Sequence, residues 1–536
     1  MPARLAKLRT AWIVLSYAGL LAAAFVSNLS RGLWEDGYFV IRFARNFWHH
    51  GCFAWNESDG PVYGMTSQTL QLLGTALYAL DASHVVILLH AALTAAALAT
   101  LFTIGWTLKR HGAFPIGLIP AALALSLPLL LELLTSGLET TLALWVVALT
   151  IVVTLELVDG HCRPTHAALA SLLVYWTRPD AILVPLVALG FLGLRHKRRI
   201  LTTYALIGLG LTASWTLFYF YYGTALPLPF YIKTHGISAQ TASHLAIFAP
   251  EKTKNALQAG FLTLPFFYVA LHARSRRTLA LLASGLALAG YHYVATIETM
   301  GHHSRFYLPA LVPIWIAAAL AYPAYLARRW LPATIAALFG YALAAYVLTK
   351  LDAAHRIDLM LDHTRYLPYL AGCACMLLAP RAKTWIAAAL VGASFWAAAI
   401  FDYEFHGLRI EPDREILLHQ IAPRRVFRGL ARLRARVPVH VLFHTDMGAP
   451  GVLFPDARVV DLDGLLNAEI TLHGARFEDL CTRDRPEAIF LPNETYRELR
   501  HTVLTSRCFQ NYRTVDDDPS SPLRVRADLR AQYVRD

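Results

Sequence analysis

The sequence predicts a polytopic α-helical membrane protein with a small α/β domain at its C-terminal end. Of its 536 residues, 56% are hydrophobic and 16% are charged, whereas a soluble globular chain averages about 45–50% apolar and about 25% charged residues. The apolar residues gather in uninterrupted runs such as 11–26, 113–131 and 385–400. Runs of about 17–25 apolar residues match the thickness of a bilayer, and in lipid they must be helical to satisfy their backbone polar groups.

The order of the apolar runs gives the expected topology. A first helix at about 9–29 leads into a large loop, 30–83, and a second loop, 222–256, separates two later groups of helices. By the length rule the chain has about 11–13 transmembrane helices, in a membrane domain of residues 1–402. The other expected helices lie at about 84–108, 113–131, 139–158, 166–177, 181–194, 200–221, 257–272, 278–297, 305–326, 332–349, 364–380 and 384–401.

The net charge of +12 reflects orientation in a membrane rather than nucleic-acid binding. Lys and Arg gather in short loops between apolar runs, for example at 109–110, 195–199 and 274–277. This is the bias typical of cytoplasmic loops. It predicts a bacterial inner-membrane protein whose loops 30–83 and 222–256 face the periplasm. The basic N-terminus runs directly into the first apolar run, which we interpret as an uncleaved signal anchor.

The composition changes at about residue 403. Short apolar segments at 437–443 and 488–491 alternate with polar stretches of helical spacing, a pattern typical of an α/β domain. By the same topology this domain, 403–536, is periplasmic. Cys481 and Cys508 both lie in it, and they are therefore candidates for a disulfide, which persists in an oxidising compartment.

An acidic pair, Glu35 and Asp36, follows the first apolar helix on the periplasmic side. Adjacent carboxylates repel each other, so one of them has a raised pKa if the two share a partly buried site. A carboxylate at the lipid–water boundary can deprotonate an acceptor hydroxyl while a lipid tail anchors the donor. The alternative is that the pair only begins the next helix, whose dipole favours acids at its N-terminus.

Three cations on the same side, Arg178, Lys233 and Arg305, lie close to helix ends and against the general charge bias. Together they could bind a phosphate, since an arginine fork suits bidentate contacts to its oxygens. Each could instead reach towards lipid headgroups. Their recurrence beside aromatic and Pro-rich loops favours a shared site.

Further polar residues on this side allow two interpretations each. Glu139 either begins a helix, where the dipole favours it, or supplies a second acid near an acceptor. His302 and His303 either bond to phosphate or acceptor or are structural, because two adjacent histidines without a third spaced ligand are a weak metal signal. The chain has no Gly-rich phosphate loop and no HExxH or GxSxG pattern. The usual motifs of ATP-driven transport and of hydrolases are therefore missing, and the sequence indicates no certain cofactor and leaves a divalent cation open.

Several of these segments resemble those of GT-C-fold glycosyltransferases. The first loop, at 35–46, 51–56 and 62–67, is similar to the first periplasmic loop of the mycobacterial terminal β-(1→2)-arabinofuranosyltransferase B family and of the related bacterial pilin arabinosyltransferases. The matches run from about residue 34 to 467 in the same order as in the family, and this agreement in order is stronger evidence for the resemblance than any single match. The later segments that resemble family motifs in the same order are 136–140, 177–180, 222–233, 305–309 and 460–467.

The resemblance implies a GT-C fold and the inverting transfer of a monosaccharide from a polyprenyl-phosphate donor, with D-arabinofuranose as the first expectation. The acceptor would be a periplasmic glycan or a pilin protein. Asp36 would be the general base, with Glu35 secondary because the family's first acid is usually Asp. Arg178, Lys233 and Arg305 would stabilise the phosphate, helped by His302 and His303, while the lipid tail lies between helices among membrane lipids.

The matched positions also imply binding residues. Asp461, Asp463 and Asn467 of the C-terminal domain would hold the acceptor. Tyr63 and Leu228 replace a Glu and an Asn of the family pattern, so donor or acceptor choice differs from that of the mycobacterial enzymes. The positions that the resemblance assigns to donor or acceptor binding in the membrane domain are Tyr38, Arg42, Asn56, Glu139 and Tyr222.

Two other functions compete with this interpretation. The first is a lipid A or protein glycosyltransferase of the same fold that uses another lipid-linked sugar, such as mannose or aminoarabinose. The second is a non-enzymatic transporter of lipid-linked sugars. Transporters carry ionisable residues or broken helices near the membrane midplane, whereas the charged residues here gather outside the apolar runs. That distribution favours an enzyme.

Overall fold

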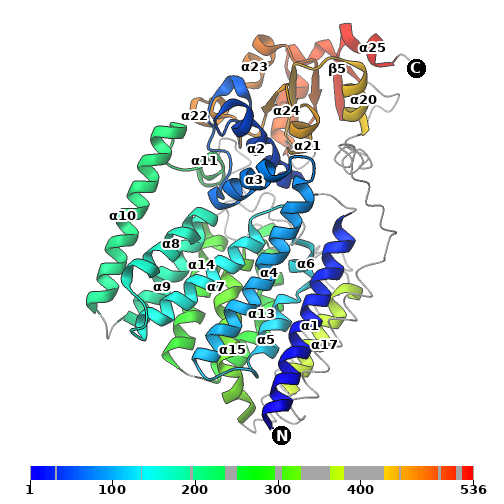
Figure 1. The fold of residues 1–536 in the computed structure, drawn as a ribbon. Coiled ribbons are helices and arrows are strands. Elements are labelled where there is room, and N and C mark those ends of the chain that lie inside the picture. Colours follow the sequence, from blue (N-terminus) through cyan, green and yellow to red (C-terminus); the bar gives the residue numbers. More distant parts are fainter. Residues whose placement is uncertain are drawn as a thin grey trace.

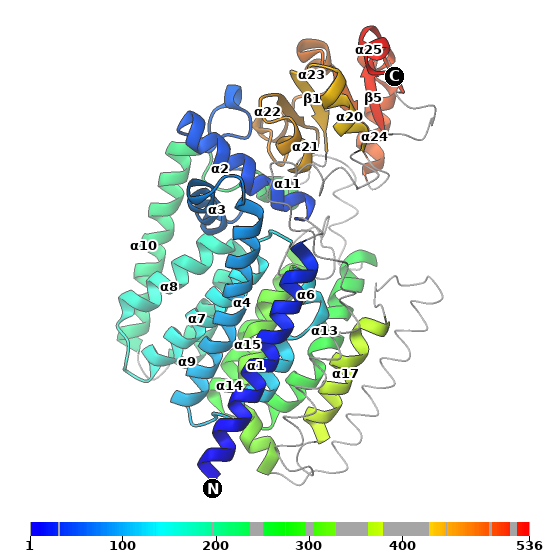
Figure 2. The same ribbon diagram turned by 45° about the vertical axis from the view of Figure 1, so that its right-hand side comes forward.

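The structure is a computed structural model that describes residues 2–29, 33–133, 136–193, 197–235, 250–273, 275–295, 305–327, 363–378, 428–445, 448–492, 496–514 and 522–534. It has three layers (Figures 1 and 2): a bundle of long helices, a layer of short helices at one end of the bundle, and an α/β domain beyond that layer. The C-terminus lies in the α/β domain, and the N-terminus lies at the opposite end of the molecule.

The bundle confirms a multi-pass membrane protein. Within the described residues, five helices are long and apolar enough to cross a membrane. Shorter apolar helices lie at 10–26, 179–192 and 255–271, while the helices expected at 332–349 and 384–401 lie outside the described residues. The five long helices are α4 (Val85–Arg110), α7 (Thr140–Val158), α10 (Lys197–Tyr222), α14 (Arg276–Ala295) and α15 (Leu308–Ala327).

Burial separates the inside of the bundle from its rim. The interior helices α7 and α15 are each buried along 72% of their apolar windows, whereas α10 is buried along only 22%. Around them stand α1 (Pro2–Leu29), α8 (Pro164–Thr177), α9 (Leu183–Leu192), α13 (Pro250–Leu271) and α17 (His363–Leu378). Figure 1 shows α10 along one edge of the bundle, which is consistent with exposure of its apolar side chains to lipid.

The prediction of one helix at 113–131 was wrong. The segment forms two short helices, α5 (Leu118–Leu125) and α6 (Pro128–Leu133). Proline has no N–H to continue a helical hydrogen-bond ladder, and it disfavours helical conformation in the residue before it. Pro128 therefore ends the first helix and occupies the first position of the second.

The loop expected at 30–83 is a folded helical layer. It contains η1 (Glu35–Gly37), α2 (Tyr38–His50), η2 (Glu57–Asp59) and α3 (Gln68–Leu80). Gly51 ends α2 at φ +76°, a left-handed conformation that favours glycine, and the Ser67 hydroxyl caps α3 by accepting the N–H of Leu70. Both views place this layer between the bundle and the α/β domain.

The α/β domain has a five-stranded mixed sheet of order β2-β1-β3-β5-β4. Strands β1 (Val441–His444), β2 (Arg458–Asp461) and β3 (Ala488–Phe490) are parallel, and β5 (Leu523–Arg526) pairs antiparallel with both β3 and β4 (Tyr512–Thr514). Phe443 of β1 is in register with Val460 and Ile489. This confirms the predicted α/β domain, and β1 and β3 lie at the two apolar segments read as strands. Helices α20 (Arg428–Arg436), α21 (Gly448–Leu453), α22 (Ala468–His473), α23 (Phe477–Asp484) and α24 (Arg497–Thr505) flank the sheet.

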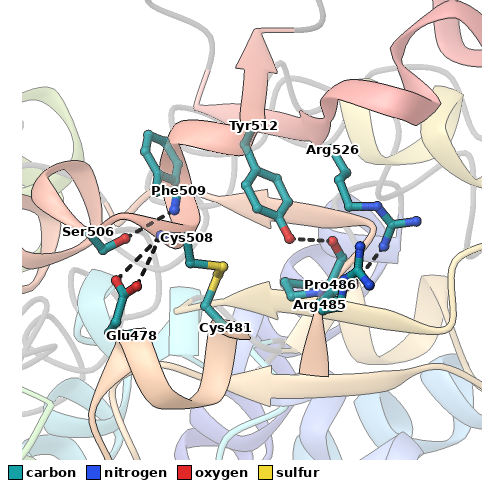
Figure 3. Close-up of a disulfide and its surroundings, with 9 residues drawn as sticks. All are labelled: Glu478, Cys481, Arg485, Pro486, Ser506, Cys508, Phe509, Tyr512 and Arg526. Carbon is teal, nitrogen blue, oxygen red and sulfur yellow. Dashed lines mark hydrogen bonds between the residues drawn. A yellow bond between two sulfur atoms is a disulfide. The ribbon is translucent and has the colours of Figure 1, made fainter. Parts of the chain in front are cut away.

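A disulfide joins Cys481 of α23 to Cys508, the two cysteines that the sequence singled out (Figure 3). The Glu478 carboxylate accepts the backbone N–H of Cys508 at 3.2 Å. Nearby, the Tyr512 hydroxyl donates to the carbonyl of Pro486. The disulfide and the Glu478 contact join the segment before β4 to α23, and Tyr512 joins β4 to the residues that follow α23.

Ion pairs connect three helices at the end of the bundle remote from the α/β domain. Arg277 of α14 pairs with Asp159 at the end of α7, and His111 lies 3.8 Å from the same carboxylate. Arg110 lies 3.7 Å from Glu156. The basic residues read as cytoplasmic therefore lie at one end of the bundle, and the α/β domain lies beyond the other.

Candidate active site

A cavity of about 490 Å³ lies where the bundle meets the helical layer. Most of its lining is apolar or aromatic, and it includes Trp215 of α10 and Phe230 of α11 (Leu228–His235). One residue of the α/β domain, Leu465, also lines it. Besides two tyrosines, Tyr175 and Tyr291, the ionisable groups of the lining are three carboxylates, two guanidiniums and one imidazole: Asp36, Glu139, Asp180, Arg178, Arg305 and His292.

Two glycines bring Asp36 and Glu139 into the same cavity. A Cβ at Gly37 would lie 2.4 Å from the carbonyl oxygen of Ser136, and Gly137 adopts φ +77°. The backbone N–H of Trp34 also donates to Ser136 at 3.0 Å. Because neither glycine has a side chain, η1 packs backbone to backbone against the turn that precedes α7.

Arg305 pairs with Asp36. Arg305 Nη2 lies 3.2 Å from Asp36 Oδ2, and the arginine side chain is more deeply buried than the carboxylate. Arg305 lies in the turn before α15, so the pair joins η1 to the start of α15. Asp36 still lines the cavity. Its carboxylate is therefore positioned by an arginine and open to a ligand.

Arg178 is positioned by the end of α8. Pro179 forces the residue before it out of the helical region, and Arg178 has extended angles, φ −156° and ψ 102°. Its buried guanidinium lies 3.5 Å from Glu139 and 3.3 Å from Asp180. These separations are long for charge-assisted hydrogen bonds, so the guanidinium lies between two carboxylates without being tightly held by either.

Beside Arg178 and Arg305 the cavity also holds Asp180, His292 and Phe306, which the sequence analysis did not name as site residues. His292 of α14 places Nε2 2.6 Å from Asp180 Oδ2. The Phe306 ring stacks on the His292 ring, with centroids 6.0 Å apart, and lies 5.3 Å from the Arg178 guanidinium and 5.2 Å from that of Arg305. A signal for His292 existed: it follows the buried residues Leu281, Leu288 and their neighbours at helical spacing, and so faces the interior rather than lipid.

Arg42 and Asn56 lie outside the cavity lining and join the helical layer to the α/β domain. Arg42 is buried and donates to the carbonyls of Trp55, Gly451, Phe454 and Ala457 and to Asn56 Oδ1. Burial lowers its pKa to about 9, which leaves it charged at neutral pH. The Asn56 side chain accepts the N–H of Val459 and donates to its carbonyl. Both residues are engaged by protein groups.

Tyr38 and Tyr222, two other residues with a predicted binding role, lie outside the cavity lining. Tyr38 is buried and accepts the N–H of Leu33 through its hydroxyl. The Tyr222 hydroxyl donates to Gln68 Oε1 at 3.1 Å, and its ring stacks on Tyr63 with centroids 4.8 Å apart. Both hydroxyls are therefore engaged by other groups of the protein.

The predicted acceptor residues of the α/β domain shape one loop. The buried Asp461 accepts the N–H groups of Asp463 and Leu466, and burial together with the Asp463 charge raises its pKa to about 8. Asn467 caps α22 by accepting the N–H of Glu469. Leu465 lies between Asp461 and Asn467 in this loop, and its side chain is part of the cavity lining.

Several predicted residues lie wholly or partly outside the described residues. His302 and His303 are among them, and the side chains of Glu35 and Lys233 are not described, although their backbones lie in η1 and α11. Within the described part of the chain, no cluster of three His, Cys, Asp or Glu side chains is arranged to hold a metal ion.

Two crystal structures share this fold. ArnT from Cupriavidus metallidurans bound to undecaprenyl phosphate aligns with a TM-score of 0.58 and 15% sequence identity, over 96% of this chain and 98% of that one. The same protein in the apo state aligns with a TM-score of 0.54 and 15% identity, over 92% and 95% of the two chains. No protein-family model and no curated protein matches the sequence. The likeness confirms the GT-C fold.

Proposed function

We propose that this protein is a membrane glycosyltransferase that moves a monosaccharide from a polyprenyl-phosphate donor to an acceptor outside the membrane. One observation carries the proposal: a carboxylate, Asp36, shares a largely apolar cavity at the end of a membrane bundle with the guanidiniums of Arg178 and Arg305. A base and phosphate-binding cations are the groups that sugar transfer from a lipid phosphate requires. The GT-C fold supports the same reaction class.

The reaction is a displacement at the anomeric carbon. Asp36 takes the proton of an acceptor hydroxyl, the hydroxyl oxygen bonds to the anomeric carbon, and the bond from that carbon to the phosphate oxygen breaks. The lipid phosphate leaves with the electron pair of that bond, and the configuration at the anomeric carbon inverts. Arg178 and Arg305 balance the developing charge on the phosphate. Lys233, His302 and His303 are proposed to assist them, and Glu35 is proposed as a secondary acid beside Asp36.

The lining of the cavity favours a lipid-linked donor. Apolar residues of η3 (Pro179–Ile182), α9 and α10, among them Ile182, Leu183 and Trp215, form the wall on the side of the bundle. A polyprenyl chain could leave the cavity along this wall and remain in the bilayer. The ArnT structure holds undecaprenyl phosphate, which supports the choice of a polyprenyl phosphate for this chain.

The disulfide and the charge distribution support a periplasmic active site. Disulfides persist in oxidising compartments such as the bacterial periplasm, and Cys481–Cys508 lies in the α/β domain on the cavity side of the bundle. The ion-paired basic residues lie at the other end, as expected for a cytoplasmic face. We therefore propose a bacterial inner-membrane protein with its catalytic cavity in the periplasm.

For the donor sugar we propose D-arabinofuranose, and for the acceptor a periplasmic glycan or a pilin protein. Both rest on the resemblance of the first loop and later segments to arabinofuranosyltransferases. Transfer of mannose or aminoarabinose to lipid A or protein would use the same cavity. Mass spectrometry of envelope glycans and pili in a deletion strain identifies the missing sugar and its attachment point together.

Replacing Asp36 with Asn tests the proposed base. The variant should lower sugar transfer by at least about 10²-fold, because general-base catalysis typically contributes 10²–10⁴-fold. The measurement is transfer from a synthetic polyprenyl-phosphate sugar by the full-length protein in nanodiscs. The matched control is Glu57→Gln, which neutralises an exposed acid of the same helical layer.

Retention of full activity by Asp36→Asn would exclude it as the base. A protein that moves labelled lipid-linked sugar across a vesicle membrane, and forms no glycoside with any acceptor, would instead be a transporter.

A further inference from the structure

Asp180 and His292 are not needed by the reaction just described, yet they form the shortest polar contact among the cavity's charged groups. His292 Nε2 lies 2.6 Å from Asp180 Oδ2, whereas the arginine–carboxylate pairs of the cavity are separated by 3.2–3.5 Å. The imidazole is 3% exposed. A buried polar contact of this kind fixes the orientation of both groups, since an unpaired buried partner is costly.

The same Asp180 carboxylate contacts the Arg178 guanidinium. Arg178 Nε lies 3.3 Å from both carboxylate oxygens of Asp180, and His292 Nε2 approaches one of them, Oδ2. With Oδ2 held by His292, the carboxylate stays at this distance on the Nε side of the guanidinium and does not close to a tight pair that would also engage a terminal nitrogen. Arg178 therefore keeps donor capacity for a ligand instead of losing it to Asp180.

The aromatic contacts support the same arrangement. Phe306 stacks on His292 and faces the Arg178 guanidinium at 5.3 Å, so the ring holds both side chains at once. Attraction between a guanidinium and an aromatic face adds to this placement. Three elements converge here: η3 supplies Asp180, α14 supplies His292, and the turn before α15 supplies Phe306.

We propose that His292 is a positioning residue that acts through Asp180 on Arg178 and so keeps that guanidinium available to the donor phosphate. This inference rests on the proposed function, because it requires Arg178 to contact a polyprenyl phosphate. His292 itself need not touch the donor. Its loss should therefore weaken donor binding through Arg178 and through no other group.

A double-mutant cycle tests this role in the full-length protein in nanodiscs, with undecaprenyl phosphate as the probe and Trp fluorescence as the signal, since Trp215 lines the cavity. His292→Ala should raise the Kd about tenfold, the scale of one hydrogen bond to a charged group. Arg178→Ala should raise it at least as much. His292→Ala should add no further loss in the Arg178→Ala background, because its effect requires the guanidinium.

Two further variants separate positioning from general stability. His292→Gln keeps a neutral donor near the Nε2 position and should restore the Kd to within about threefold of the original protein. His272→Ala removes another imidazole of the bundle, which contacts Tyr268 and Tyr325 instead, and should leave the Kd unchanged. In transfer assays, His292→Ala should raise the donor KM and leave the acceptor KM unchanged.

Additive losses in the cycle, or an unchanged Kd in His292→Ala, would overturn the positioning role and leave the proposed function standing. An unchanged Kd in Arg178→Ala would remove the proposed phosphate contact, and the positioning role with it.

Discussion

Arg42 illustrates how one residue can look functional and serve the architecture. Its match to a glycosyltransferase loop implied a binding role, whereas in the structure its guanidinium reaches backbone carbonyls on both sides of the boundary between the helical layer and the α/β domain. The planar fork of arginine presents five N–H donors in fixed directions. The hydrogen bonds of Arg42 therefore help to hold the α/β domain in its place over the cavity.

Arg42→Ala should destabilise the contact between the helical layer and the α/β domain. Removal of the guanidinium leaves several buried carbonyls unpaired, and we expect a loss of about 3–5 kcal/mol. Arg42→Lys should recover only part of it, because a lysine cannot reproduce the fork. Thermal unfolding and protease sensitivity of the full-length protein measure the effect.

Arg45 of the same helix is the matched control. It pairs with Asp456, whose side chain is 85% exposed, and such pairs contribute about 0–1 kcal/mol. Equal losses for Arg42→Ala and Arg45→Ala would contradict the assignment of Arg42 as the main contact.

At the scale of elements, the loop between β2 and α22 connects the α/β domain to the cavity. Asp461 and Asn467 fix its two ends through backbone N–H groups, and Leu465 reaches the lining between them. Leu466 packs so closely on Gly64 that a Cβ there would lie 2.2 Å from it. The loop approaches from the side opposite the bilayer, which is the side from which an acceptor would enter.

Leu465→Trp should therefore impair use of the acceptor more than use of the donor. Overpacking a well-filled site costs about 1–3 kcal/mol, so we expect the acceptor KM to rise by about tenfold or more. The Kd for undecaprenyl phosphate should stay unchanged. Steady-state kinetics with each substrate varied in turn gives the comparison.

Leu472→Trp supplies the control, because Leu472 is an exposed residue of α22 in the same segment. A donor Kd that rises as much as the acceptor KM in Leu465→Trp would place this loop on the donor side.

At the scale of the whole molecule, the helical layer and the α/β domain cover one end of the membrane bundle (Figure 2). The other end carries ion-paired basic residues. Two native cysteines mark the two ends. Cys52 follows α2 in the helical layer, and Cys162 follows α7 at the opposite end. Neither is in a disulfide.

These cysteines test the orientation of the protein in the membrane. A membrane-impermeant maleimide applied to intact spheroplasts should label Cys52, whereas Cys162 should react only after permeabilisation. Each variant keeps one of the two cysteines and the Cys481–Cys508 disulfide, with Cys373 and Cys375 replaced by Ala. Labelling of Cys162 in intact spheroplasts would reverse the proposed orientation.

Local chemistry made several features predictable from the sequence. Long apolar runs require membrane helices, and the α/β domain follows from short apolar segments between polar stretches. The carboxylate Asp36 and the guanidiniums Arg178 and Arg305 were predictable as one site, since each lies just beyond an apolar run on the same side. The cavity holds all three.

Contacts between distant parts of the chain decided the rest. The Asn56 side chain forms a hydrogen bond with Val459, which lies 403 residues further along the chain. No local sequence pattern distinguishes an asparagine that joins two layers from one that binds a sugar. His292 and Asp180 lie on different helices, and only packing of α14 against α9 brings their side chains together. The sequence by itself determined which residues can lie in the membrane and on which side the polar groups gather, because hydrophobicity and charge act locally. The tertiary structure alone decided which of those polar groups share a cavity, because that depends on how helices far apart in the chain pack.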